Sequence, residues 1–330
     1  MTNQSILAKQ HTKLNAVFLD QQTFDSNIDL AQISKQVNGL TCYQTTQPAQ
    51  VVERCSAVEI IITNKVILDA ATLAQLPKLK LICITATGYN NVDLAQAKAL
   101  GIAVCNVSGY AKQSVAQYVF AQLLEYFNQT SHHNQNTDKG LWPKSETFCL
   151  HGNTITELAG KSIGIIGYGD LGQSVAKIAQ AFEMKVLIAE RPNAKQIRHN
   201  RMAFEQVISQ ADILSFHCPQ TPETEGLISQ ALLKKMKSTA VVINTARGAL
   251  VNNEDLLNAL TNNEIAYAIL DVLDQEPPPA DHILLNAKLD NLKITAHIAW
   301  ASIEAQQRLI SLVGKNIDSF YSHGELNRIA

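Results

Sequence analysis

Short apolar runs alternate with amphipathic segments along most of the chain. Short apolar runs bounded by turn residues are typical of strands buried on both faces of a parallel sheet. Apolar positions spaced three or four apart between these runs indicate helices, so the pattern predicts βαβ units and an α/β fold. The predicted strands are residues 16–19, 58–63, 79–85 and 102–107, followed by 162–167, 186–189, 211–217, 240–245, 266–272 and 292–296.

The strands fall into two series, which predicts two doubly wound parallel-sheet domains. Between the series, residues 112–128 carry apolar side chains every three or four positions, and this spacing predicts a well-buried helix. Residues 128–140 are polar and weakly patterned, which predicts a loop. A last helix is expected over residues 302–322, followed by a polar tail.

Composition and charge limit the classes of function that are expected for this chain. The 330 residues carry a formal net charge of −2, which indicates neither nucleic-acid nor membrane affinity. Residues 1–15 are polar and lack the apolar core of a signal peptide, and no apolar run is long enough to span a bilayer. The six cysteines show no CxxC pairing, so we expect buried reduced thiols, no metal site and a cytoplasmic protein.

Residues 161–172, KSIGIIGYGDLG, predict a buried strand, a glycine turn and a helix. Gly167, Gly169 and Gly172 match the G-x-G-x-x-G fingerprint of dinucleotide-binding folds. The first glycine allows the tight turn, the second lets the pyrophosphate approach the backbone, and the third lets the helix lie close to the strand. The unpaired N–H groups of the following helix would bind the phosphates.

A second apolar run ends at Glu190, 23 residues after Gly167. An acid at this position accepts hydrogen bonds from the adenosine ribose and would repel a 2′-phosphate, which favours NAD over NADP. Arg191 follows directly and weakens that preference, because an arginine there can pair with a 2′-phosphate. Taken alone, the glycine motif could also be a glycine-rich surface turn. The strands predicted on either side of it and the acid at the end of the second strand make a surface turn much less favoured.

Polar groups follow three later strands of the second series. Arg247 follows one strand, Asp271 and Glu276 lie at and beyond the end of the next, and His297 follows the last. Ligands of open parallel sheets bind outside the carboxyl ends of the strands, so these groups would converge there. Taken singly, each has a structural alternative: a surface charge after a strand, or a histidine satisfied in the core.

Together these segments resemble the D-isomer-specific 2-hydroxyacid dehydrogenases, over about residues 55–320. The motifs are ATGYNNVD at 86–93, CNVSGY at 105–110, SVAQ at 114–117, ELAGKSIGIIGYG at 157–169, HCPQTPET at 217–224, NTARG at 244–248, DVLDQEP at 271–277 and HIAWAS at 297–302. The resemblance implies a flavodoxin-like substrate domain of residues 1–107 plus 299–330. It also implies a Rossmann NAD-binding domain of residues 108–298, with the active site in the cleft between the two domains.

The resemblance also implies roles for single residues. Arg247 would bind the substrate carboxylate and carbonyl oxygen, which suits a planar and permanently charged guanidinium. His297 would be the acid in reduction and the base in oxidation, with Glu276 pairing with it to stabilise the imidazolium. Backbone amides at Thr87, Gly88 and Tyr89 would hold the carboxylate. The remaining implied residues are Trp300 beside the substrate and, around the NAD cofactor, Gly167, Tyr168, Gly169, Asp170, Leu171, Gly172, Glu190, Arg191, His217, Cys218, Pro219, Thr245, Ala246 and Asp271, the last orienting the nicotinamide carboxamide.

The HIAWAS motif resembles that of glycerate dehydrogenases, also called hydroxypyruvate reductases, and so implies reduction of hydroxypyruvate to D-glycerate. Trp300 is equally consistent with a core aromatic residue under the last helix. One alternative is a broader reductase of glyoxylate or pyruvate. Another is a non-catalytic NAD-sensing corepressor, whose partner-binding tails we do not see in this chain. The family pattern further implies a homodimer through the cofactor domains, although monomer burial explains the apolar helix equally well.

Overall fold

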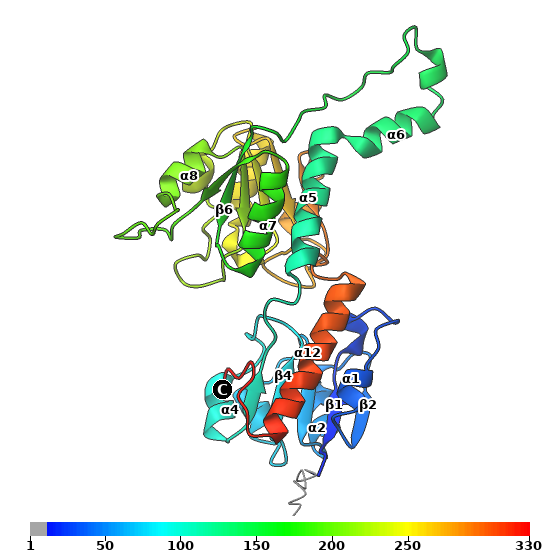
Figure 1. The fold of residues 1–330 in the computed structure, drawn as a ribbon, viewed down its shortest axis with the longest axis vertical. Helices are drawn as coiled ribbons and strands as arrows, with labels where there is room; N and C mark the ends of the chain where they lie inside the picture. Colours follow the sequence, from blue (N-terminus) through cyan, green and yellow to red (C-terminus); the bar gives the residue numbers. More distant parts are fainter. Residues whose placement is uncertain (1–11) are drawn as a thin grey trace, which may run out of the picture. The chain divides into compact units, whose positions relative to one another are not determined.

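The computed structural model describes residues 12–330, so part of the expected polar N-terminus lies outside the described residues. The chain divides into two compact units (Figure 1). Unit 1 comprises Met1–Ala111 and Ala301–Ala330, and unit 2 comprises Lys112–Trp300. The substrate-binding and NAD-binding assignments of the two predicted domains remain predictions at this point.

The sheet of unit 1 contains five parallel strands in the order β2-β1-β3-β4-β5. This is the flavodoxin-like order. The strands are β1 (Asn15–Phe18), β2 (Gly39–Cys42), β3 (Ile60–Thr63), β4 (Leu81–Ile84) and β5 (Ala103–Cys105). The helices are α1 (Ala31–Ser34), α2 (Val51–Cys55), α3 (Ala70–Leu73), α4 (Leu94–Ala99) and α12 (Ile303–Tyr321), with 3-10 turns η1 (Gln21–Thr23) and η2 (Pro48–Gln50).

Local sequence explains these elements. β3 and β4 are buried at every residue, as expected for apolar strands covered on both faces. Asp69 and Asp93 accept hydrogen bonds from backbone N–H groups in the first turns of α3 and α4, which caps both helices. α12 contacts α1 and β4 and lies along the sheet (Figure 1). Gly314 permits this packing, because a Cβ there would lie 2.5 Å from the carbonyl oxygen of Gln32.

The sheet of unit 2 contains six parallel strands in the order β11-β10-β9-β8-β6-β7. Its strands are β6 (Ser162–Ile166), β7 (Lys185–Ile188), β8 (Ile213–Phe216), β9 (Val241–Asn244), β10 (Tyr267–Leu270) and β11 (Leu292–Ile294). Its helices are α5 (Lys112–Asn128), α6 (Thr130–Asp138), α7 (Asp170–Ala181), α8 (Phe204–Gln210), α9 (Gln230–Leu233), α10 (Asn253–Thr261) and α11 (Ile283–Asn286), with 3-10 turns η3 (Trp142–Lys144) and η4 (Gly248–Leu250).

A single parallel bridge joins Met202 to Ala189, directly after β7. Counting this bridge as a reduced third strand, the order from Met202 through β7, β6, β8, β9 and β10 is the 3-2-1-4-5-6 order of the Rossmann fold. The prediction of two parallel-sheet α/β domains, one flavodoxin-like and one Rossmann, is therefore confirmed.

The predicted helix over residues 112–128 is α5, which packs beside α7 in unit 2 (Figure 1). Its buried residues include Val119, Phe120 and Leu123, so the apolar spacing identified the buried face correctly. The predicted last helix is α12, shorter by one residue at each end. The ten predicted strands are all present, most of them trimmed at one or both ends.

One expectation about local structure is wrong, and one strand was not predicted. Residues 130–138 form helix α6 rather than a loop, and none of its residues is buried. A polar helix without a buried face has no apolar periodicity to detect. Strand β2 was missed because three of its four residues are exposed, so it lacks the apolar run of the central strands.

All six cysteines are free. Cys55, Cys83 and Cys105 are buried as expected, whereas Cys42 is exposed and Cys149 and Cys218 are half-buried. Among residues 12–330, no helix is both long enough and apolar enough to cross a membrane.

Candidate active site

The glycine turn after β6 lies against the segment that follows β8. Gly167 has φ of 97°, and a Cβ there would lie 2.5 Å from the backbone nitrogen of Cys218. A Cβ on Gly172 would lie 2.1 Å from the carbonyl oxygen of Gly167, so α7 can begin close to the strand only with glycine. A Cβ on Gly169 would meet nothing within 4 Å, which leaves open space at the N-terminus of α7.

Two buried polar atoms near these strand ends have no hydrogen-bond partner among the described residues. They are Nδ1 of His217, after β8, and Oγ1 of Thr245, after β9. Buried polar groups are normally hydrogen-bonded, so unpaired ones at a ligand-binding edge are consistent with a polar ligand. Together with the open N-terminus of α7, they fit a dinucleotide at the carboxyl edge of this sheet.

The catalytic pair predicted after β10 and β11 is in contact. Nδ1 of His297 lies 2.6 Å from Oε2 of Glu276. The other carboxylate oxygen of Glu276 accepts a hydrogen bond from the backbone N–H of Leu273, which fixes the carboxylate orientation. Nε2 of His297 makes no hydrogen bond with a described residue, and its side chain is 27% exposed. The free nitrogen is therefore available to a ligand.

The turn that carries His297 is held by Asp271. The Asp271 carboxylate is 1% exposed and accepts hydrogen bonds from the hydroxyl of Thr295 and the backbone N–H groups of Ile298 and Ala299. Its carbonyl oxygen accepts from the N–H of His297, whose φ is 54°. A left-handed histidine is uncommon and needs surrounding contacts to hold it. The role expected for Asp271 toward nicotinamide stays a prediction.

Helix α5 supports the same turn through two hydroxyls. The hydroxyl of Ser114 donates to the carbonyl oxygen of Ala299 at 2.7 Å. The hydroxyl of Tyr118 bonds to Oγ1 of Thr295, and because Thr295 donates to Asp271, Tyr118 must be the donor. Burial raises the pKa of Tyr118 to about 12, so the phenol keeps its proton.

Arg247 follows β9 in a turn that lies directly on the Glu276 loop. The Asn244 side-chain amide spans this turn, donating to the carbonyl oxygen of Arg247 and accepting from the N–H of Ala246. A Cβ on Gly248 would lie 1.9 Å from the backbone of Leu273, so only glycine lets the two loops meet. The Arg247 guanidinium donates to the carbonyl oxygen of Ala246.

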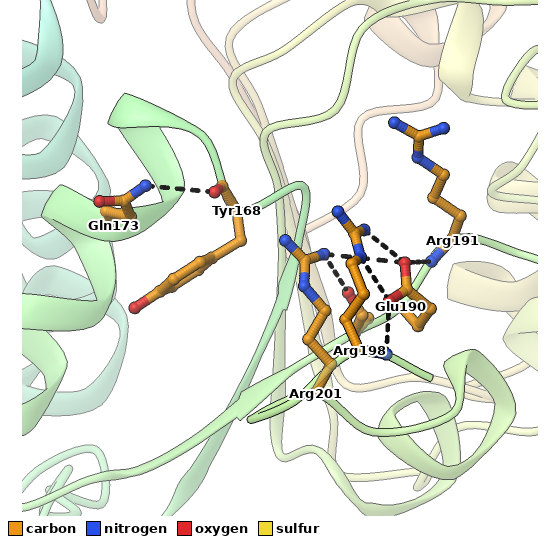
Figure 2. Close-up of polar contacts among 7 residues, drawn as sticks. Tyr168, Gln173, Glu190, Arg191, Arg198 and Arg201 are labelled. Carbon is orange, nitrogen blue, oxygen red and sulfur yellow. Dashed lines mark hydrogen bonds and ion pairs between the residues drawn. The ribbon is translucent and has the colours of Figure 1, made fainter. Parts of the chain in front are cut away.

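The structure places the other predicted residues in both units. Thr87, Gly88 and Tyr89 belong to unit 1, after β4, and their backbone N–H groups donate to no described residue. Glu190 comes two residues after β7 and is bound by Arg198 (Figure 2). The rest lie in unit 2: Tyr168 in the glycine turn, Asp170 and Leu171 at the start of α7, Arg191 after Glu190, Cys218 and Pro219 after β8, Ala246 beside Arg247, and Trp300 after the His297 turn.

Sequence reasoning missed several residues of this region. Ser114 belongs to the SVAQ motif and Tyr118 follows it, but a helix pattern does not show which hydroxyls point at a distant turn. Thr295 lies two residues before His297 and was taken only as part of a strand end. Arg198 and Arg201 lie in a loop without motif or periodicity, and only the fold brings them to Glu190.

Comparison with known families agrees with the fold. Residues 120–299 match the family described as "D-isomer specific 2-hydroxyacid dehydrogenase, NAD binding domain". A glycerate dehydrogenase of Methylorubrum extorquens is 40% identical over 92% of this chain and 95% of its own length. A hydroxypyruvate reductase of Blautia hydrogenotrophica is 37% identical over 86% of this chain and 88% of its own length.

The fold is also found among solved structures. An acyclic imino acid reductase, solved in complex with NADPH and D-Arg, superposes with a TM-score of 0.82 at 26% identity. The superposition covers 96% of this chain and all of the other. Both units of this chain therefore occur together in an enzyme of known structure.

Proposed function

Because this chain belongs to the D-isomer specific 2-hydroxyacid dehydrogenase family and is an NAD-dependent oxidoreductase, we propose that it reduces hydroxypyruvate to D-glycerate. The contact of 2.6 Å between His297 and Glu276 carries the proposal, because this pair can hold and deliver a proton. The two curated relatives named for glycerate dehydrogenase and hydroxypyruvate reductase support this choice of substrate.

His297 exchanges the proton with the substrate oxygen through Nε2, because Nδ1 is engaged by Glu276. In reduction Nε2 donates to the carbonyl oxygen, and the Glu276 carboxylate stabilises the imidazolium before transfer. In oxidation the same nitrogen accepts the hydroxyl proton. Asp271 and the hydroxyls of Ser114 and Tyr118 hold the His297 turn in place.

Arg247 binds the substrate carboxylate and the oxygen on which negative charge develops. Its guanidinium stays charged at every working pH and offers planar, bidentate donors. When bound, NADH supplies the hydride that reaches C2 of the substrate.

The carboxyl edge of the sheet in unit 2 would hold the cofactor. The open space at Gly169 would leave room for the pyrophosphate, and the first N–H groups of α7 would donate to it. Nδ1 of His217 and Oγ1 of Thr245, which have no partner among the described residues, would supply polar contacts from the neighbouring strand ends.

A substrate panel tests the proposal. Loss of NADH absorbance is followed with hydroxypyruvate, glyoxylate and pyruvate at equal concentrations. We expect kcat/KM to be highest with hydroxypyruvate. A clear preference for glyoxylate or pyruvate would keep the chemistry and reject this substrate. NADH binding without turnover of any acid would reject catalysis in favour of a sensing role.

We also propose a cytoplasmic homodimer. Six free thiols suit a reducing compartment. In unit 2, Trp142 and Phe148 are 52% and 90% exposed and follow helix α6, which buries none of its residues. Large exposed aromatic side chains are enriched at interfaces between chains. Light scattering after size exclusion tests the dimer: twice the mass of 36.1 kDa is expected, and a monomer would reject it.

A further inference from the structure

The loop that carries Glu276 is exposed along most of its length. It joins β10 to α11, and every residue from 274 to 281 is exposed to solvent. Residues 277–279 are three prolines, which have no backbone N–H and so cannot donate main-chain hydrogen bonds to hold the loop. Burial in the core therefore does not fix the stretch on which Glu276 lies, and other contacts must hold it in place.

A buried histidine closes this loop. His282 directly precedes α11, and its side chain is 5% exposed. Its Nε2 lies 2.8 Å from Oδ1 of Asp274, and its Nδ1 accepts a hydrogen bond from the backbone N–H of Leu284 at 3.3 Å. Because Nδ1 is the acceptor, Nε2 carries the proton and donates it to the Asp274 carboxylate. This hydrogen bond joins the two ends of the exposed stretch.

A neighbouring helix holds the same carboxylate. Asn253 is the first residue of α10, and its side-chain amide donates to Oδ1 of Asp274 at 2.9 Å. Burial raises the pKa of Asp274, but hydrogen bonds from His282 and Asn253 lower it further, so the pKa lies below its ordinary value. The carboxylate is therefore ionised at neutral pH and accepts both hydrogen bonds.

Asp274 lies close to the site in the chain and in space. A Cβ on Gly248 would lie 2.3 Å from the backbone nitrogen of Asp274, so the loop begins against the turn that carries Arg247. Only Gln275 separates Asp274 from Glu276. Holding Asp274 in place therefore restricts the positions that the Glu276 carboxylate can reach.

We propose that Asp274 and His282 are positioning residues, whose hydrogen bond forms a clasp that holds Glu276 against His297. Without this clasp the exposed stretch gains conformational freedom, and Glu276 spends less time within hydrogen-bonding distance of Nδ1 of His297. The imidazolium of His297 is then stabilised less. The inference rests on the proposed function, since it names further residues that support the same proton transfer.

Two variants open the clasp from opposite sides. Asp274→Ala removes the acceptor, and because Asp274 is 46% exposed, the variant should fold. His282→Asn removes the donor, while the asparagine oxygen can still accept from the N–H of Leu284 as an N-cap. Asp281→Asn is the matched control, because it removes an acid from the same exposed stretch at a side chain with no hydrogen bond or ion pair to a described residue.

Three measurements are made on each variant and on the double variant. They are the melting temperature, the NMR titration of the His297 ring without substrate, and kcat and KM for hydroxypyruvate as a function of pH. All variants leave Asp271 and Arg247, the other charged residues predicted for the site after β9 and β10, unchanged.

Opening the clasp should move the His297 titration and the alkaline limb of the kcat profile to lower pH, in the direction expected for Glu276→Gln. At neutral pH kcat should fall about fivefold, as expected for the loss of one hydrogen bond, while KM and the Kd for NADH change less than about twofold. The double variant should lose no more kcat than the more affected single variant, because both act through one contact. Asp281→Asn should behave like the parent.

A lower melting temperature with a parent-like titration of His297 would overturn the inference, because the clasp would then stabilise only the fold. Additive losses of kcat in the double variant would also overturn it. The proposed function fails separately: the His297 titration would shift in the clasp variants as described, yet hydroxypyruvate would not turn over in the parent.

Discussion

At the scale of single residues, the chemistry depends on how side chains are held. His297 has its backbone in the left-handed region and its Nδ1 against Glu276, so of its two ring nitrogens only Nε2 has no hydrogen-bond partner among the described residues. Glu276 in turn is fixed by the N–H of Leu273. The Glu276 carboxylate is therefore held within hydrogen-bonding distance of the His297 ring.

Replacing Glu276 by Gln keeps the shape of this pair and removes its charge. Without the carboxylate the imidazolium is less stable, so the alkaline limb of the hydroxypyruvate reduction profile should move to lower pH. At neutral pH kcat should fall about tenfold or more. The measurement is kcat against pH from 5 to 9. An unchanged profile would remove Glu276 from proton transfer.

Burial lowers the pKa of His217 to about 4, below the ordinary value of about 6.5. At low pH the unfolded chain therefore binds a proton at His217 that the folded chain does not bind. Stability is unaffected above about pH 6.5 and falls as pH drops from there toward 4, by at most ~1.4 kcal/mol per pH unit.

Melting temperature at pH 7 and pH 5 tests this effect. His217→Gln should lose less stability between these two pH values than the parent protein, whereas the exposed His199→Gln should behave like the parent. Equal acid sensitivity in His217→Gln and parent would show that another group controls the loss.

At the scale of elements, α5 and the loops after β9 and β10 assemble the site. Tyr118 and Ser114 lie one helical turn apart on α5 and both bond to the segment around His297. The helix therefore positions a turn that lies far from it in sequence. Its apolar spacing predicted burial, while the direction of its hydroxyls required the packed structure.

Tyr118→Phe removes the hydrogen bond to Thr295 and leaves the ring in place. We expect a loss of about 1 kcal/mol in stability, as for a typical hydrogen bond, and a several-fold fall in kcat with an unchanged Kd for NADH. Tyr126→Phe is the matched control, because Tyr126 lies on the same helix and packs its ring on Tyr267. Equal kcat in Tyr118→Phe and this control would deny Tyr118 a positioning role.

Gly248→Ala should separate two loops. A Cβ at 1.9 Å from the Leu273 backbone forces movement, with an expected cost of about 1–3 kcal/mol. Because Arg247 and Glu276 lie on these loops, kcat/KM should fall together with melting temperature. Gly39→Ala, whose Cβ would meet only the Asn15 side chain at 3.4 Å, should leave both nearly unchanged. A parent-like Gly248→Ala would contradict the close loop contact.

At the scale of the whole molecule, the core of unit 1 keeps three of the six thiols away from solvent. Cys55, Cys83 and Cys105 lie in the core of unit 1, and burial raises the pKa of each; for Cys55 it reaches about 12. Thiolates are the reactive form, so these residues should be inert in the folded protein.

Labelling with iodoacetamide at neutral pH, read by peptide mass spectrometry, should modify Cys149 and Cys42 first and the three core cysteines only after unfolding. Cys218, whose pKa burial raises to about 11, should react slowly. Early labelling of Cys83 would indicate that unit 1 opens in solution.

The sequence by itself determined the parallel strands, the buried helix α5 and the glycine turn, and it predicted Arg247, Glu276 and His297 as candidate site residues. These follow from local signals: apolar runs, helical spacing and motifs whose members lie close together in the chain. Only the tertiary structure decided that Tyr118 and Ser114 support the His297 turn, that Gly248 joins two loops, and that Arg198 encloses Glu190. Each of these contacts joins segments that lie far apart or without motif in the sequence. Their proximity depends on the order of the strands in the sheet and on the path of the loops, and a local pattern of polar and apolar residues encodes neither of these.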